Sequence, residues 1–100
     1  MRWDWNEAKN RSNQRKHRLS FEQARRVFDD PFAISKLDTR SQEERWHTVG
    51  MVEGVVIIVV HTWQADDETR GPYEHEGAGR LISARKATRR ETKAYEEGEF

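Results

Sequence analysis

The chain has 100 residues, no cysteine and a 34% apolar share, which suits one small domain over residues 1–100 and excludes a disulfide framework and a thiolate metal site. Its longest apolar run, Val55 to Val60, is too short to cross a bilayer, and the N-terminus lacks the basic and apolar segments of a secretory leader, so we expect a soluble, cytoplasmic protein without membrane contact. Lys and Arg balance Asp and Glu at 18 each, but eight basic against three acidic residues lie in 1–28, four against eleven in 29–78, and six against four in 79–100. The two basic segments would attract a polyanion even though the total charge is zero.

The first 28 residues predict two short helices. Good helix formers run over residues 6–17. A second helix is predicted over residues 21–28, because Ser20 and Gln23 match a capping box and apolar residues follow at helical spacing. It ends before Pro31, since the residue before a proline avoids the helical region. The first helix is expected to pack through one narrow face made of Trp5, Ala8 and Ser12.

Four strands are predicted after the proline. Residues 32–37 alternate loosely, as in a short edge strand, and residues 45–52 and 55–63 form a hairpin around Glu53-Gly54. Because residues 55–60 are apolar on both faces, this strand is expected at the centre of the sheet. An acidic loop over 64–78, expected to be mobile, separates it from a fourth strand over 80–85.

A C-terminal helix is predicted from Thr88 to about Glu97, because Thr88 and Glu91 match a second capping box. The predicted class is therefore α+β, with two N-terminal helices, a four-stranded mainly antiparallel sheet and this last helix.

Three groups of residues resemble the BrnT toxins of type II toxin-antitoxin systems. The group that resembles the family's opening comprises Trp3-Asp4, Lys9, Asn13, Lys16-His17, Ser20-Phe21, Ala24 and Val27 to Pro31. Glu44-Arg45-Trp46 with Gly50 resembles its second-strand motif, and Leu81 to Glu91 with Tyr95-Glu96 resembles its C-terminal signature. Arg18 stands where the family usually has glycine, so we expect a less regular turn there than the left-handed helix stop that glycine favours.

The resemblance implies a RelE-like fold and a ribonuclease that inhibits translation. It also implies a hetero-oligomer with a BrnA-type antitoxin, whose ribbon-helix-helix part would make the only contact with DNA. RNA cleavage without a metal needs a base for the 2′-hydroxyl, an acid for the leaving oxygen and cations for the added charge. We expect no cofactor and no metal, because no set of Asp, Glu and His residues has ligand spacing on the predicted elements.

Basic residues in the matching segments are the main candidates for this chemistry. The candidate catalytic residues are Arg85, Arg45, Glu91 and His17. The candidate substrate-binding residues are Lys16, Lys86, Arg89, Arg80 and His61.

Several candidates have a structural alternative. Lys16 and His17 end a helix, where cations favour the dipole, and Glu91 can close the capping box. Arg45 is either ion-paired or a phosphate binder, and His61 suits a hydrogen-bonded core histidine. We expect Asn13 to be structural and Tyr95 to pack on the sheet.

The alternative function is a catalytically degenerate toxin that binds its antitoxin and acts as a co-repressor. The lack of an obvious catalytic dyad and the departure at Arg18 favour it. In either case, an acidic or amphipathic antitoxin segment is expected to cover Arg45 and Arg85. A direct DNA-binding domain has less support, since the sequence has no helix-turn-helix, ribbon-helix-helix or zinc-finger pattern.

Overall fold

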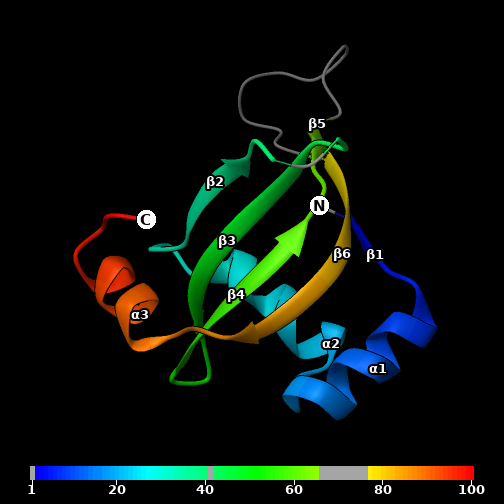
Figure 1. The fold of residues 1–100 in the computed structure, drawn as a ribbon, viewed down its shortest axis with the longest axis horizontal. Coiled ribbons are helices and arrows are strands. Elements are labelled where there is room, and N and C mark those ends of the chain that lie inside the picture. The colour runs from blue at the N-terminus through cyan, green and yellow to red at the C-terminus, as the bar shows by residue number, and fades with distance from the viewer. Residues whose placement is uncertain (1, 41, 66–76) are drawn as a thin grey trace.

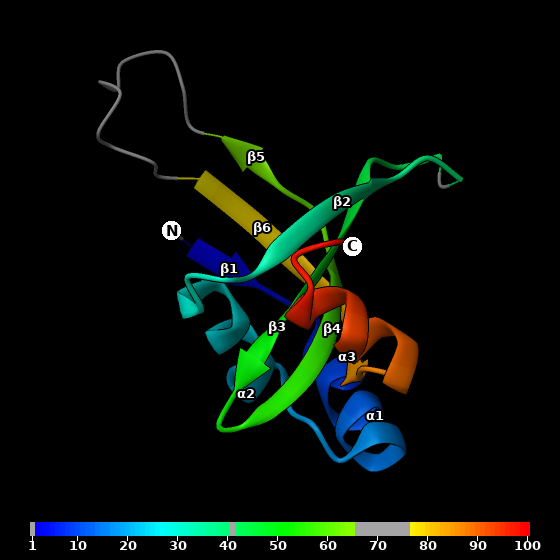
Figure 2. The ribbon, with the colours of Figure 1, turned by 90° about the vertical axis from the view of Figure 1, so that its left-hand side faces the viewer.

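The computed structural model describes residues 2–40, 42–65 and 77–100, which form an α+β fold with helices packed against a mixed sheet (Figures 1 and 2). The strands are β1 (Arg2–Asp4), β2 (Ile34–Asp38), β3 (Arg45–Val52), β4 (Val55–His61), β5 (Gln64–Ala65) and β6 (Gly77–Lys86). The helices are α1 (Glu7–His17), α2 (Phe21–Ala24), the 3₁₀ helix η1 (Arg25–Asp29) and α3 (Arg89–Glu96). None of the helices in these residues is long and apolar enough to cross a membrane.

The strand order in the described residues is β1-β6-β4-β3-β2, with β5 paired to the start of β6. β1 runs parallel to β6, and the other pairs are antiparallel. The prediction of four strands is therefore wrong, because β1 and β5 are too short to show an alternating pattern. β6 also begins at Gly77, within the predicted loop, whereas the mobility expected of that loop concerns residues 66–76, which lie outside the described residues.

β4 lies in the middle of the sheet, as predicted, and both of its faces are covered. One core cluster, which includes Phe21, Ile57 and Val59, packs beneath the N-terminal helices. A second cluster of Val49, Val56 and Ile58 packs with Tyr95 of α3 and with Phe100. The predicted hairpin turn is also confirmed, since Glu53 and Gly54 both have the positive φ, 50° and 81°, that a two-residue type I′ turn requires.

The prediction for the packing face of the first helix is right for Trp5, which packs against the core, but the inward face of α1 itself is polar. Ala8 and Ser12 are exposed, whereas Asn10 and Asn13 are buried. The Asn13 amide donates to the Ala84 carbonyl (2.9 Å) and accepts from the Ala84 N–H (3.1 Å), as a neighbouring strand residue would. The Asn13 side chain therefore provides hydrogen-bond partners for the backbone of β6 on the edge that faces α1. Asn13 has the structural role expected of it.

The second helix is shorter than predicted, and the strand that follows it begins later. The α-helical part ends at Ala24 and continues as η1, while the Ala33 N–H donates to the Asp30 carbonyl in a turn, so β2 starts only at Ile34. At the end of α1, Arg18 keeps the left-handed conformation (φ 55°, ψ 36°), and its N–H donates to the Gln14 carbonyl at 2.8 Å. The expectation of a less regular turn is wrong, because a single L-residue can adopt this conformation at a cost of roughly 1–2 kcal/mol.

Candidate active site

The predicted site residues lie towards two ends of the sheet. Arg85, Lys86, Arg89 and Glu91 lie where β6 leads into α3, whereas Arg45 and His61 lie where β3 begins and β4 ends. Val49 pairs with Ile58 and Ile58 pairs with Arg85, so Arg85 lies on the same face of the sheet as Val49 and Arg45. Arg45 is four residues along β3 from Val49, and Arg85 is two strands across from Val49, so the two arginines are roughly 16 Å apart. Lys86 faces the opposite side from Arg85, because neighbouring strand residues alternate.

Lys16 and His17 form the last turn of α1, one turn beyond Asn13. Because Asn13 contacts Ala84, these two side chains are closer to the β6–α3 end than to Arg45. Lys16 is exposed and His17 is half-buried. Among the described residues, neither side chain has a hydrogen bond or an ion pair, so both can contact a ligand and both stay candidates.

Arg85 and Glu91 form a two-bond ion pair at the N-terminus of α3. The Arg85 Nη atoms donate to the two Glu91 carboxylate oxygens at 2.8 and 3.0 Å. Glu91 also accepts from the Thr88 N–H at 2.8 Å and so closes the predicted capping box. The hydrogen bonds from Arg85 are the main reason that the pKa of Glu91 falls to about 2. A carboxyl group with this pKa is ionised at neutral pH and cannot act as a general acid there.

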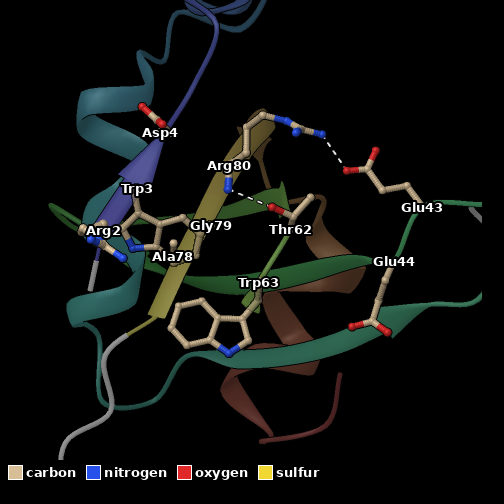
Figure 3. A pocket seen from close by; sticks show the side chains of 10 residues that line it. All are labelled: Arg2, Trp3, Asp4, Glu43, Glu44, Thr62, Trp63, Ala78, Gly79 and Arg80. Carbon is tan, nitrogen blue, oxygen red and sulfur yellow. Dashed lines mark hydrogen bonds and ion pairs between the residues drawn. The ribbon is translucent and has the colours of Figure 1, made fainter. Parts of the chain in front are cut away.

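Arg80 lies beside a cleft of about 770 Å³ near β1 and β6 (Figure 3). Its guanidinium reaches across the cleft to Glu43 at 2.6 Å, and its backbone N–H donates to Thr62 Oγ1 at 2.9 Å (Figure 3). A side chain at Gly79 would collide with the Trp3 ring, so glycine is needed for Trp3 to pack here. Arg2, Asp4 and Glu44 also line this cleft, so its two arginines face three carboxylates and its net charge gives little attraction for a phosphate.

His61 is buried and hydrogen-bonded at both ring nitrogens. Nδ1 lies 2.9 Å from the Thr62 carbonyl and must donate to it, so Nε2 accepts from the Thr48 hydroxyl at 2.6 Å in the neutral imidazole. Burial is the main cause that lowers the pKa of His61 and favours this neutral form. The ring lines a 310 Å³ pocket with Trp3, Phe28, Ser35, Trp46 and Trp63. Contact with a substrate would require His61 to give up a bond that it makes here.

The structure also pairs His47 with Asp38, and neither residue is among the predicted site residues. The two residues lie diagonally across β2 and β3, and His47 Nε2 is 3.1 Å from Asp38 Oδ2. Hydrogen bonds from the Arg40 N–H and then from His47 lower the pKa of Asp38, so this carboxylate is ionised at neutral pH. Strand alternation puts His47 on the same face as Arg45, and this pattern was the available signal. The pairing with Asp38 needed the register of the hairpin between β2 and β3.

We name the face of the sheet that carries His47 and Arg45 the cationic sheet face. Its polar members, all on the α3 side by strand register, are Lys36, Asp38, Arg45, His47, Ser83 and Arg85. Lys36 Nζ lies 4.6 Å above the Phe100 ring, and Arg45 has its nearest carboxylate, Glu43, at 3.9 Å. The Arg45 Nε is buried without a hydrogen-bond partner in the part of the chain that the structure describes. Of the two arginines on this face, Arg45 is therefore paired less fully than Arg85.

Among the described side chains, no three His, Asp or Glu residues cluster closely enough to hold a metal ion. The fold and the cationic sheet face define a small α+β protein that presents a carboxylate-oriented histidine and arginines on an open sheet. The chain belongs to the BrnT family, since the family model described as the ribonuclease toxin, BrnT, of type II toxin-antitoxin systems matches residues 5–91. No curated protein matches the chain.

Proposed function

We propose that this BrnT-family toxin is a metal-independent endoribonuclease in which His47 carries the acid-base chemistry. The observation that carries the proposal is the bond between His47 Nε2 and the ionised Asp38, next to Arg45 on the cationic sheet face. Because Asp38 only accepts hydrogen bonds, Nε2 holds a proton and Nδ1 of the neutral ring is left as the base. Asp38 would also stabilise the imidazolium that forms when Nδ1 takes a second proton.

The proposed reaction is attack by a ribose 2′-oxygen on the adjacent phosphorus. His47 Nδ1 takes the 2′-hydroxyl proton, the bond from phosphorus to the 5′-oxygen breaks, and the leaving 5′-oxygen takes a proton from a water molecule. The products are a 2′,3′-cyclic phosphate and a 5′-hydroxyl. Arg45, whose side chain is 37% exposed, would stabilise the charge that develops on the phosphoryl oxygens through its guanidinium Nη groups.

The other candidates take supporting roles in this proposal. Arg85 holds a phosphate roughly 16 Å from Arg45, and Glu91 keeps its guanidinium in place. Lys16, His17, Lys86 and Arg89 would add phosphate contacts near the β6–α3 end. His61 and Arg80 are already bonded to Thr48 and Glu43. In this proposal they hold the shapes of the aromatic pocket and of the cleft, and RNA would contact those two hollows.

The partner in this proposal is a BrnA-type antitoxin with a ribbon-helix-helix part, in a hetero-oligomer with the toxin. An acidic or amphipathic segment of the antitoxin would cover Arg45 and Arg85, and DNA would be bound only through the antitoxin. An RNA substrate used in translation places the activity in the cytoplasm.

Purified protein and a labelled single-stranded RNA test this function in the presence of EDTA. We expect cleavage to persist in EDTA, to leave 2′,3′-cyclic phosphate ends, and to fall at least about 100-fold in His47→Gln. Arg45→Ala should also be impaired, whereas Arg11→Ala, which removes an exposed arginine from α1, should cleave like the unchanged protein.

Full activity in His47→Gln would overturn the assignment, and loss of cleavage in EDTA would overturn metal independence. A protein that cleaves no RNA but binds its antitoxin would instead support the degenerate co-repressor.

A further inference from the structure

Phe32 is a large apolar side chain that the fold holds in water. It is 73% exposed, although it lies in a well-bonded turn. Asp30 Oδ1 accepts from the Phe32 N–H (2.9 Å), and Asp30 Oδ2 accepts from the Met51 N–H (2.8 Å) and the Tyr95 hydroxyl (2.6 Å). One carboxylate thus ties the turn to β3 and to α3. The exposed aromatic ring is presented on a fixed backbone, which lowers the entropy lost when a partner binds.

Phe32 lines two grooves, and Tyr95 also lines both. One groove, of about 440 Å³, runs between Phe32 and Met51, which is itself 43% exposed. The other, of about 420 Å³, runs between Phe32 and the end of α3, where Tyr95 and Gly98 line it. We call Phe32 with these two grooves the Phe32 ridge. An aromatic ridge between two hollows is a shape that can interlock with side chains of another protein.

Carboxylates surround the Phe32 ridge. The acidic residues that line the two grooves are Asp29, Asp30, Glu53, Glu96 and Glu97. The cations beside them are Arg26, which pairs with Glu53, and Lys93, which lies 4.0 Å from Glu97. The surplus of negative charge opposes RNA and favours a protein segment with apolar side chains flanked by lysine or arginine.

We propose that the Phe32 ridge is a docking surface for the antitoxin, which inserts apolar side chains flanked by basic residues. The proposal rests on the proposed function for the identity of this partner. The surface is separate from the cationic sheet face, since Phe32 precedes β2 whereas His47 pairs with Lys36 farther along that strand. The antitoxin would therefore make two contacts of opposite charge, an acidic one over Arg45 and Arg85 and a basic one at the ridge.

Phe32→Asp tests the proposal, with the purified antitoxin from the same operon as the probe. Leu37→Asp is the matched control, because Leu37 is also exposed, at 42%, on β2 but outside both grooves. Calorimetry should show at least about thirtyfold weaker binding for Phe32→Asp and little change for the control. Phe32→Asp should cleave RNA like the unchanged protein but need more antitoxin for inhibition. Replacing Glu96 and Glu97 together by Gln should slow association and reduce its dependence on salt.

Equal antitoxin affinities for Phe32→Asp and Leu37→Asp would overturn the proposal. A toxin that is dimeric alone and becomes monomeric through Phe32→Asp would also overturn it, since the ridge would then bind a second copy. The binding measurement needs no nuclease activity. If the unchanged protein cleaves no RNA while Phe32→Asp loses the antitoxin, the ribonuclease proposal fails and the docking surface stands.

Discussion

The ion pair between Arg85 and Glu91 should make the stability of the protein depend on pH in acid. Glu91 has a pKa of about 2, against 4.5 for an unperturbed glutamate. This difference corresponds to about 3.4 kcal/mol in favour of the ionised form. Because the Arg85 side chain is 42% exposed, water screens the pair, and we expect it to contribute about 1–2 kcal/mol to the free energy of unfolding.

The direction in which stability changes with pH follows from the lowered pKa of Glu91. Glu91 stabilises the fold fully above pH 4.5, and this contribution is lost as the pH falls from 4.5 towards 2. Glu91→Gln keeps an oxygen for the Thr88 N–H but removes the charge. The variant should therefore be about 1–2 kcal/mol less stable than the unchanged protein at pH 7, and the two should converge near pH 2.

Urea unfolding followed by tryptophan fluorescence at several pH values measures this difference. Glu97→Gln is the control, because Glu97 is more exposed and lies 4.0 Å from its nearest cation, Lys93. Parallel pH profiles for Glu91→Gln and the unchanged protein would refute the reasoning.

Two further variants test the buried face of α1 and its C-terminal end. Asn13→Ala should cost about 3 kcal/mol and lower the melting temperature by about 15 °C, because the Ala84 N–H and carbonyl lose their partner. Calorimetry against the exposed-site variant Gln14→Ala checks this, and a decrease below about 4 °C would contradict it. Arg18→Gly should stabilise by about 1 kcal/mol, since glycine adopts φ 55° without strain. Urea midpoints should move the opposite way for Arg15→Gly, which lies inside the same helix, and a lower midpoint for both would contradict the prediction.

The elements with strong local signals were predictable from the sequence. The capping boxes at Ser20 and Thr88 mark helix starts that the structure confirms, and the apolar run from Val55 identifies the central strand. β1 could not be found in this way, because its three residues become a strand only by pairing with β6. The same holds for the polar inner face of α1, whose Asn13 is stabilised by a strand 71 residues away.

The candidate site was predictable in composition but not in arrangement. The basic run from Arg80 to Arg90 reads as one cluster in the sequence, yet β6 sends Arg85 and Lys86 to opposite faces. Glu91 closes the predicted cap, and its carboxylate also pairs with Arg85, a contact that the sequence did not specify. The pair of His47 and Asp38 depends on the register between β2 and β3, which short-range patterns do not specify.

The position of β6 between β1 and β4 has a consequence for the order in which the protein can fold. Both β1 and β4 pair with β6, so the edge of each strand that faces β6 has no partner until residues 77–86 have been synthesised. Arg85 and the α3 end of the cationic sheet face are absent until the same moment. Such pairing between distant parts of a chain slows folding. A partly synthesised chain therefore lacks Arg85, and the cationic sheet face is complete only after most of the chain has been made.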